Sequence, residues 1–319
     1  MLKIIPYSGA RLQSYQNFAR RNWGERCYQQ TEKYLRWLYQ ENPCADKENS
    51  FLIAVEPRRN EVVGVMHKMR LPWLVDGQKV LVSSIHNLLV DRDYRQGSGL
   101  MLITASLKGE AHVLCPGVLP PLSEAYKMLR CQEIDALWFR KIISPLGAAA
   151  QKIFGLALPP RKKINRAQIL TEPSAAQIAA MTAALNQCSG GHVLWDAEIF
   201  NWRFLQGPKH VFLWVDAANF LILSVGQRKG LTVARIIDGH IENENSTLWQ
   251  DALNAARSLG AVVLLGYTAD KNLRKYFLAR IRPRVRHPLV FFYHRDKKIR
   301  ELNFNAAAGD FGLESFLSN

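Results

Sequence analysis

The sequence predicts a mixed α/β protein with two tandem domains, each a mixed, mostly antiparallel sheet flanked by helices. The chain has 319 residues, more than the roughly 100–200 residues of one typical domain. Short runs of β-branched and aromatic residues alternate with segments of helical periodicity in both halves. The pattern Trp37-Leu38-Tyr39 with Pro43 also recurs as Trp202-Arg203-Phe204 with Pro208, about half the chain further on. Such a repeat indicates duplication of one domain.

The first half predicts a domain over residues 1–146. Lys79–Val90 is a long β-branched run and predicts a buried strand, and Arg58-Arg59-Asn60 predicts a turn between two earlier strands. The predicted strands of this half are Leu2–Ile5, Phe51–Glu56, Glu61–Arg70, Lys79–Val90, Ala111–Cys115 and Ile134–Ile143. Its predicted helices are Leu12–Trp23, Thr31–Tyr39, Leu100–Glu110 and Leu122–Arg130.

Residues 147–166 are rich in alanine, proline and basic residues and are interpreted as a linker with a short helix. A second domain is predicted over 167–319. Glu172-Pro173-Ser174 opens a helix, because a proline in the first turn loses no helical hydrogen bond, and Gly260 ends another. The predicted strands are Ala167–Thr171, Val211–Val215, Phe220–Gly226, Leu231–Asp238, Ala261–Gly266 and Leu289–His294, and further helices are predicted at Asp196–Phe204, Thr247–Leu259 and Asp270–Leu278.

Composition excludes several classes of protein. No apolar run approaches the roughly 18–20 residues of a membrane span, and the N-terminus lacks the features of a secretion signal, so a cytoplasmic protein is expected. Five scattered cysteines without a CxxC pair favour reduced thiols and no metal site. The net charge of +15 attracts polyanions such as a phosphorylated cofactor. Without an RNP-type, zinc-finger or helix-turn-helix pattern, nucleic acid is not an expected partner.

The segment from Val90 to Leu100, with the sequence VDRDYRQGSGL, is the main candidate for chemistry. A buried strand runs into a glycine-containing turn and then directly into a helix. Backbone N–H groups at a helix N-terminus converge and bind anions, and Arg95 can add a charged donor. The segment therefore predicts a pyrophosphate site, and the alternative is a plain tight turn.

This segment resembles the acyl-CoA loop of the GNAT acetyltransferase superfamily, in which a strand, a Tyr-Arg pair and a glycine-bearing turn open a helix. The chain is similar to bacterial proteins with two tandem GNAT domains, which are associated with surface-polysaccharide and sugar modification. The resemblance implies an N-acetyltransferase that uses acetyl-CoA. The residues that it implies for the cofactor are Leu89, Val90, Arg95, Gln96, Gly97, Ser98, Gly99 and Leu100.

The loop departs from the family pattern, which places Gly three residues after an Arg or Gln, and Gly or Ala two residues later. Counted from Arg95, these positions hold Ser98 and Leu100. Counted from Gln96, they hold Gly99 and Met101. We therefore expect a turn that is one residue shorter or differently kinked.

Amine acylation needs a base for the acceptor ammonium, donors for the thioester carbonyl and an acid for the leaving thiolate. His86 lies on the strand that enters the loop, which in GNAT proteins splays from its neighbour, and it is the candidate base; His67 and Glu56 are weaker candidates. A hydrogen-bonded core histidine is the alternative. The backbone N–H of Leu89 or Val90 is the candidate donor to the carbonyl.

The candidate acid is Tyr126. The tyrosine that the family often carries on its fourth helix falls near Leu129, and Tyr126 lies one turn earlier. A tyrosine that faces the core is the alternative for this position.

The corresponding junction of the second half, Ile237–Asn245, has one glycine, no arginine and two glutamates. Negative side chains repel a phosphate, so this domain is not expected to bind acyl-CoA. Asp310 and the basic run Arg280–Arg286 are candidates for an acceptor cleft, with plain surface charge as the alternative.

The sequence thus predicts an acyltransferase that moves an acetyl group from acetyl-CoA to an amine of a sugar or small metabolite. One alternative is an aminoacyl-tRNA-dependent transferase of the same doubled architecture, which the +15 charge suits. The other is a catalytically degenerate GNAT-like protein that binds a glycan or a partner.

Overall fold

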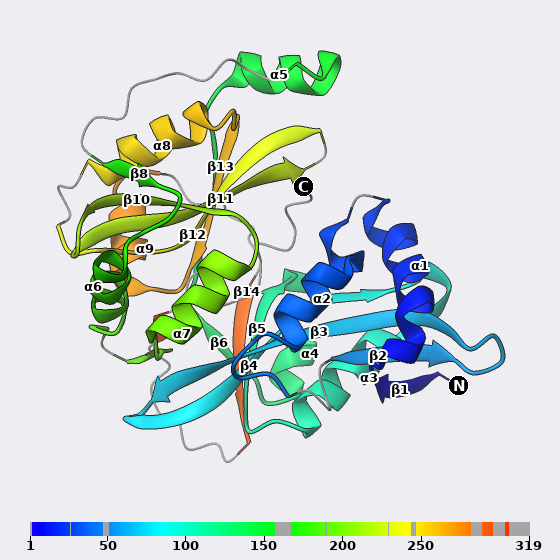
Figure 1. Cartoon of the computed structure of the whole chain (residues 1–319). Coiled ribbons are helices and arrows are strands. Elements are labelled where there is room, and N and C mark those ends of the chain that lie inside the picture. Colours follow the sequence, from blue (N-terminus) through cyan, green and yellow to red (C-terminus); the bar gives the residue numbers. More distant parts are fainter. Residues whose placement is uncertain are drawn as a thin grey trace. The chain divides into compact units, whose positions relative to one another are not determined.

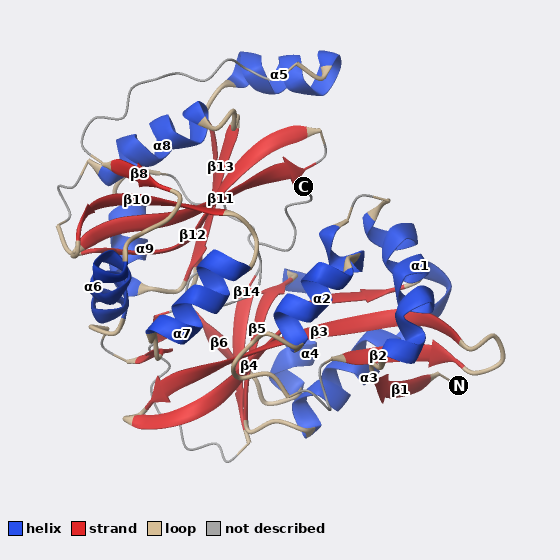
Figure 2. Cartoon of the chain, in the orientation of Figure 1, coloured by secondary structure: helices blue, strands red, loops and turns tan. Residues whose placement is uncertain are grey.

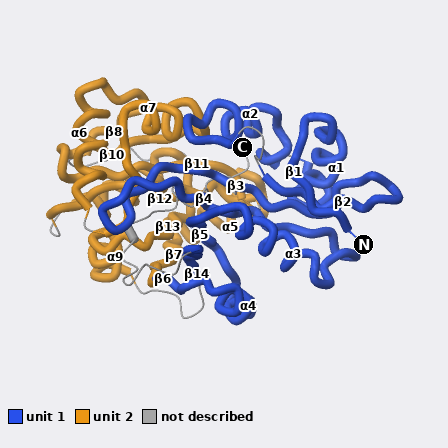
Figure 3. Tube along the Cα trace, turned by 90° about the horizontal axis from the view of Figure 1, so that it is seen from below, with its two compact units in different colours: residues 1–134, 288–302 blue, residues 135–287, 303–319 orange. Residues whose placement is uncertain are grey.

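A computed structural model describes residues 2–25, 27–46, 51–156, 167–188, 190–228, 230–243, 247–281, 289–295 and 304–305. The chain divides into two compact units (Figure 3): unit 1 comprises residues 1–134 and 288–302, and unit 2 comprises 135–287 and 303–319. Each unit contains one sheet with helices packed on it (Figures 1 and 2). The predicted fold class, with mixed and mostly antiparallel sheets, is confirmed.

The sheet of unit 1 has the strand order β1-β2-β3-β4-β5-β14-β6. Its strands are β1 (Lys3–Pro6), β2 (Leu52–Glu56), β3 (Glu61–Val75), β4 (Gln78–Val90), β5 (His112–Val118), β6 (Gln132–Ile134) and β14 (Leu289–His294). Its helices are α1 (Leu12–Trp23), α2 (Glu32–Tyr39), α3 (Arg95–Lys108) and α4 (Ser123–Met128), with short 3-10 turns at Gly9–Arg11, Tyr28–Gln30, Arg92–Tyr94 and Pro120–Leu122. β4 and β5 are parallel, whereas the other neighbours on this path are antiparallel.

The sheet of unit 2 has the order β8-β10-β11-β12-β13-β7. Its strands are β7 (Leu137–Ile142), β8 (Gln168–Leu170), β10 (His210–Asp216), β11 (Asn219–Arg228), β12 (Leu231–Ile241) and β13 (Val263–Thr268). Two further short strands, β9 (Gly191–Val193) and β15 (Phe304–Asn305), pair in parallel and are not part of this six-stranded sheet. The helices are α5 (Pro145–Phe154), α6 (Ala175–Leu185), α7 (Ala197–Phe200) with a following π-helical turn Asn201–Gln206, α8 (Leu248–Ser258) and α9 (Lys271–Leu278). In the main sheet, β12 and β13 form the parallel pair.

Along the two strand orders given above, both sheets are mostly antiparallel with one parallel pair of strands. Each sheet also contains a strand from the other half of the chain. β14, from near the C-terminus, pairs with β5 and β6 in unit 1, whereas β7 pairs with β13 in unit 2. The segment predicted as one strand over Ile134–Ile143 is therefore two strands in two different sheets. Leu289–His294, predicted to close the second half, completes the sheet of unit 1. The two units consequently differ from the predicted segments 1–146 and 167–319 by this exchange.

β3 and β4 form a longer hairpin than predicted. The turn between them consists of Asp76 and Gly77, whose φ angles are 49° and 75°. An Asp-Gly pair with positive φ at both positions matches the right-handed twist of a two-residue hairpin. The strands therefore continue to Val75 and restart at Gln78, rather than ending at Arg70 and restarting at Lys79.

The aromatics of the internal repeat lie in matching places in the two units. Trp37 is 3% exposed on α2, which precedes β2, and Trp202 is 1% exposed on the π-helical turn that precedes β10. β2 and β10 each occupy the second position of their strand order. This correspondence agrees with duplication of one domain.

Helix α6 begins at Ala175, directly after the predicted start Glu172-Pro173-Ser174, so Ser174 is its N-cap and Pro173 precedes its first turn. The Ser174 side chain accepts from the backbone N–H of Gln177, and the Gln177 side chain accepts from the backbone N–H of Ser174. This capping box satisfies two backbone donors that a helix leaves without internal partners. The end of α8 is likewise marked by Gly260, with φ 78°.

Candidate functional site

β4 and β5 pair over a short stretch and then part. Ser83 pairs with Val113, and Ser84 with Leu114. β4 continues beyond these pairs to Val90, while β5 pairs with β14 on its other side. The pairing between the two parallel strands thus stops well before either strand ends, so they part toward their carboxyl ends. This agrees with the splayed strand that the resemblance implies.

A β-bulge bends β4 just before the candidate loop. His67 of β3 pairs with His86, but Val65 pairs with Leu89, so Asn87 and Leu88 together face one residue of β3. Asn87 has φ 53°, a conformation that non-glycine residues seldom adopt. Bulges of this kind re-aim side chains and increase the local twist. The predicted donors Leu89 and Val90 follow the bulge directly.

The turn into α3 is kinked where the sequence departs from the family pattern. Gln96 and Gly97 have non-helical backbone angles, with φ/ψ of −64°/95° and 80°/−18°. Regular helix geometry resumes at Ser98. The Gly97 conformation favours glycine, and a Cβ added at Gly97 would meet no atom within 4 Å. Gln96 and Gly97 are exposed, so the space at the start of the helix is open to a ligand.

The two ends of this turn are held by hydrogen bonds. Arg95 Nε donates to the Val90 carbonyl oxygen over 3.1 Å, which ties the start of α3 to the end of β4. The Asp91 carboxylate accepts from Arg21 Nη2 at 2.8 Å and from Asn22 Nδ2 at 2.5 Å, both on α1. These contacts fix the turn relative to the sheet without using the backbone N–H groups of residues 97–100.

His86 is 3% exposed, and its ring faces that of His67 at a centroid separation of 5.9 Å. His86 Nδ1 lies 3.2 Å from the Ser84 carbonyl oxygen. A carbonyl oxygen only accepts, so Nδ1 carries the proton and Nε2 is the basic nitrogen of the neutral ring. His86 therefore has the tautomer that a general base needs.

His67 belongs to a chain of hydrogen bonds that fixes its tautomer. The Lys68 backbone N–H donates to the Tyr39 hydroxyl over 3.3 Å, so the Tyr39 proton is directed to His67 Nδ1 at 2.7 Å. On the other side, Tyr15 donates to the Gln29 carbonyl over 2.7 Å and accepts from His67 Nε2 over 3.0 Å. Both ring nitrogens of His67 are satisfied in the neutral form. His67, which the sequence offered as a weaker candidate base, is therefore a hydrogen-bonded core histidine.

Burial, together with the nearby His86, lowers the pKa of His67 well below its ordinary value of about 6.5. Burial also raises the hydroxyl pKa values of Tyr15 and Tyr39. The unfolded chain binds a proton at this histidine near pH 6.5, whereas the folded chain does not. The stabilising effect of neutral His67 is therefore complete above that pH and is lost as the pH falls toward the folded pKa.

We expect the free energy of unfolding to fall by up to about 1.4 kcal/mol per pH unit between about pH 6.5 and 5 because of this histidine. Urea titrations at a series of pH values measure the slope. The pKa of His240 is also lowered by burial, so the comparison that matters is between the native protein and His67→Gln, which should have a shallower slope. Equal slopes for the two proteins would contradict the expectation.

Tyr126 lies in the core of unit 1 rather than at the turn. It is 5% exposed, and its ring stacks on Phe291 of β14 at a centroid distance of 5.4 Å. Burial raises the pKa of its hydroxyl, and the neighbouring thiols Cys115 and Cys131 raise it further. Tyr126 thus faces the core, which was the alternative to its role as the acid. It belongs to a hydrophobic cluster with residues of α3 and β5.

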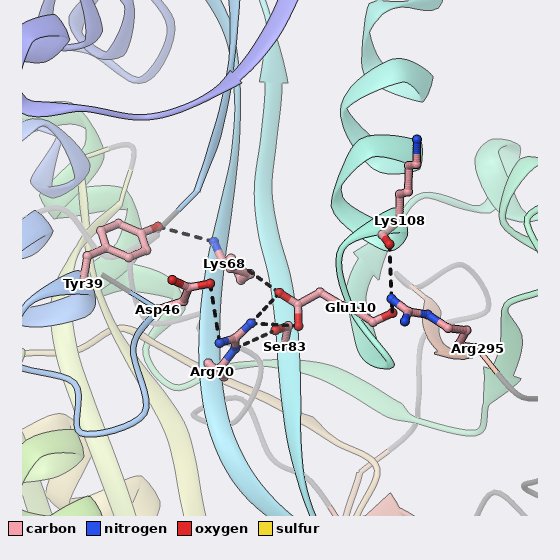
Figure 4. Close-up of polar contacts among 8 residues, drawn as sticks. All are labelled: Tyr39, Asp46, Lys68, Arg70, Ser83, Lys108, Glu110 and Arg295. Atoms are coloured by element: carbon pink, nitrogen blue, oxygen red, sulfur yellow. Dashed lines mark hydrogen bonds and ion pairs between the residues drawn. The ribbon is translucent and has the colours of Figure 1, made fainter. Parts of the chain in front are cut away.

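A buried ion cluster beside this sheet was not predicted from the sequence (Figure 4). Glu110, between α3 and β5, accepts from Lys68 Nζ at 2.9 Å and from Arg70 Nη2 at 2.8 and 3.0 Å. Asp46 lies 3.7 Å from Arg70 Nη1, so two carboxylates face two cations. Burial raises the pKa of Glu110, but the hydrogen bonds and charges of Lys68 and Arg70 outweigh it and lower the pKa below its ordinary value. No sequence motif links these residues, which come together only in the folded sheet.

Arg295, just past β14, extends this arrangement to the end of α3 (Figure 4). Its Nη2 atom donates to the carbonyl oxygens of Lys108 and Glu110, each over 3.2 Å. A cation at the carboxyl end of a helix satisfies carbonyl groups that lack helical partners. The returning C-terminal strand thereby fixes the end of α3 opposite the kinked turn.

In unit 2, the corresponding position has different chemistry. Gly239 lies within β12, where an added Cβ would come within 2.6 Å of the Phe220 carbonyl oxygen, so this glycine allows close strand packing rather than anion binding. A polar pocket of about 180 Å³ lies at the end of β12, and its lining residues are Gln187, His240, Ile241, Glu242, Asn272, Lys275 and Tyr276. The predicted junction is described as far as Asn243. Asp310 and Arg282–Arg286 lie outside the described residues.

Among the described residues, no three His, Cys, Asp or Glu side chains gather as a metal site. The diverging strands, the bulge, the kinked turn and His86 make up the candidate site of unit 1.

No family model and no curated protein matches the sequence. Solved structures do match. Saccharomyces cerevisiae N-myristoyltransferase with bound myristoyl-CoA has a TM-score of 0.64 at 13% identity, over 92% of this chain and 82% of that one. A putative acetyltransferase from Pyrococcus horikoshii has a TM-score of 0.58 at 12% identity, over 97% and 93%. A GCN5-related N-acetyltransferase from Kribbella flavida has a TM-score of 0.53 at 14% identity, over 92% and 72%. The chain therefore has the fold of the GNAT superfamily in a doubled form, with one such sheet in each of its two units.

Proposed function

We propose that the protein is an acyltransferase that moves an acyl group from acyl-CoA to an amine of a sugar or small metabolite. One observation carries this proposal: the parallel strands β4 and β5 part, and β4 then bulges and enters an exposed glycine turn at the start of α3. Similar structures include a transferase with bound myristoyl-CoA and acetyltransferases, which supports acyl-CoA as the donor.

The turn suits a pyrophosphate on physical grounds. Gly97 leaves open space, and an added Cβ at Gly99 would meet only the Leu88 side chain, at 3.9 Å. Helix α3 presents its first N–H groups and the positive end of its dipole at this place. Arg95 is exposed and adds positive charge. Gln96, Ser98 and Leu100 complete the segment that we propose to contact acyl-CoA, together with Leu89 and Val90.

Acyl-CoA supplies an activated thioester when bound. In the proposed mechanism, His86 Nε2 takes a proton from the acceptor ammonium, because the bond from Nδ1 to the Ser84 carbonyl leaves Nε2 basic. The backbone N–H of Leu89 or Val90, past the bulge, donates to the carbonyl oxygen that becomes negative. Tyr126 is the proposed acid that returns a proton to the leaving CoA thiolate. Neutral His67 adds no positive charge beside His86.

The proposal also covers the acyl group that is transferred, the cellular location and the number of acyl-CoA sites. We propose acetyl as the group transferred, in a cytoplasmic bacterial enzyme, on the resemblance of the loop to acetyltransferases. We further propose that unit 2 does not bind acyl-CoA, because its corresponding strand β12 ends at Ile241 and is followed by the acidic Glu242 without a glycine turn. Titration should then give one acyl-CoA per chain.

Calorimetry with acetyl-CoA and myristoyl-CoA tests the proposal. We expect micromolar binding of at least one of them, and a loss of about 100-fold in affinity for Arg95→Glu, since a cation near the phosphates is replaced by an anion. Arg228→Glu makes the same charge change on an exposed residue of unit 2 and should bind normally. Thermal unfolding confirms that both variants are folded.

Unchanged affinity of Arg95→Glu would refute the placement of the turn. If neither acyl-CoA compound binds but an aminoacyl-tRNA does, the tRNA-dependent transferase would replace the proposal. If acetyl-CoA, myristoyl-CoA and the aminoacyl-tRNA all fail to bind, the result would favour a GNAT-like protein that only binds a glycan or a protein partner.

A further inference from the structure

Helix α5 presents an apolar surface to solvent. Four large side chains on and just after it are strongly exposed: Leu146 (87%), Ile153 (69%), Phe154 (70%) and Leu156 (59%). Leu146 and Ile153 are seven residues apart and therefore share one face of the helix. Single exposed apolar residues are ordinary, but four within one short segment form a patch. We call these four residues the α5 patch.

The helix is well defined, although its apolar face is uncovered. The Ser144 hydroxyl accepts from the backbone N–H of Gly147 over 3.2 Å as an N-cap, Pro145 begins the helix, and Gly155 ends it with φ 65°. The opposite face is anchored to unit 2 by Gln151. Its side chain donates to the Gly260 carbonyl over 3.0 Å and accepts from the Thr232 N–H over 2.8 Å. The α5 patch is therefore held outward by structure on the other face.

The charged residues in the stretch of sequence that contains α5 all have one sign. From Ala136 to Thr171 the sequence contains seven Lys or Arg residues and no Asp or Glu. Those in the described chain, Arg140, Lys141 and Lys152, are all exposed. The other four, Arg161, Lys162, Lys163 and Arg166, lie outside the described residues. An apolar surface within a purely cationic stretch is complementary to a surface that is apolar beneath a negative layer.

We propose that α5 docks this protein on an anionic lipid surface. Leu146, Ile153 and Phe154 enter the boundary between head groups and acyl chains, and the exposed Arg140, Lys141 and Lys152 contact the lipid phosphates. Among the described helices, none is long and apolar enough to cross a bilayer, so the contact is a peripheral one. The cations match lipid phosphates, and the α5 patch matches the apolar layer beneath them. A single small anion would not cover the α5 patch.

Co-sedimentation of the full chain with vesicles tests this. One vesicle contains only phosphatidylcholine, and the other contains about 30 mol % phosphatidylglycerol. We expect binding to the anionic vesicle, and binding weakened by about ten-fold or more when salt rises from about 0.1 to 0.5 M. Ile153→Ser combined with Phe154→Ser should lower binding by about ten-fold or more at low salt.

The matched control is Met128→Ser, which removes an apolar side chain that is 78% exposed on α4 of unit 1 and should bind as the native chain does. Circular dichroism verifies that the variants are folded. No binding to the anionic vesicle, or equal binding by the Ile153/Phe154 double variant, overturns the proposal. So does gel filtration showing a dimer that this double variant abolishes, because a second copy of the chain would then cover the α5 patch.

Discussion

Replacing His86 by glutamine is expected to lower kcat by about 10²- to 10⁴-fold, with little change in the affinity for acyl-CoA. Glutamine keeps a similar volume and polarity but cannot take a proton from an ammonium group. His86 stands beside the bulge of β4, and its Nδ1 atom is held at 3.2 Å from the Ser84 carbonyl, so the loss is one of proton transfer and not of position. Steady-state kinetics with saturating acyl-CoA and a varied amine acceptor measure it.

The pH profile distinguishes a base from a residue that merely packs. In the native protein, kcat/KM should fall on the acid side as the imidazole takes a proton, and His86→Gln should lack that limb. His294→Gln is the control: His294 pairs with His112 at the amino end of β5, away from the end where β4 and β5 part. A His86→Gln variant that keeps its turnover, or that keeps the acid limb, would remove His86 from the mechanism.

The local elements of this fold could be predicted because their signals are local. α1 runs over Leu12–Trp23 as expected, since its apolar residues follow a helical period, and α6 begins within a residue of the predicted start Glu172-Pro173-Ser174. Element types and order could be predicted for the same reason. A known loop resemblance then predicted the GNAT fold, with which the solved structures agree.

Pairing partners could not be predicted, because a strand's own residues do not say which neighbour it chooses. Leu289–His294 has the apolar pattern of a buried strand in either sheet, yet it lies between β5 and β6 of unit 1. The break between β6, which ends at Ile134, and β7 was also not visible in the hydrophobic pattern of the sequence. Both features depend on contacts between segments far apart in sequence.

The candidate site shows the same division. The glycine turn and His86 lie on one continuous segment, so a sequence pattern could reveal them. The Tyr39–His67–Tyr15 chain and the Glu110 cluster join residues from several elements, and only the fold brings them together. A charge pattern cannot show that Lys68 and Arg70, on alternate positions of β3, face the same carboxylate.

Glu110→Ala is expected to destabilise the protein by about 3 kcal/mol, because it leaves Lys68 and Arg70 without their shared carboxylate in a place where water is scarce. The side chain of Glu110 is 9% exposed, and those of Lys68 and Arg70 are 15% and 18% exposed. Urea unfolding at neutral pH measures the change in the free energy of unfolding. Since the pKa of Glu110 is lowered in the fold, its contribution is present above about pH 4.3 and is lost as the pH falls through the folded pKa.

A second ion pair of the same length provides the control. Lys127 Nζ lies 2.9 Å from Glu124 Oε1, as Lys68 Nζ does from Glu110, but Glu124 is 76% exposed. Glu124→Ala should therefore change stability by less than about 0.5 kcal/mol, because exposed pairs are screened by water. The triple variant Lys68→Met, Arg70→Met, Glu110→Leu should recover much of the loss, since it leaves no cation without a partner. If Glu110→Ala and Glu124→Ala were equally mild, the buried cluster would not hold β3 to the end of α3, and the sheet beside His86 would rest on apolar packing alone.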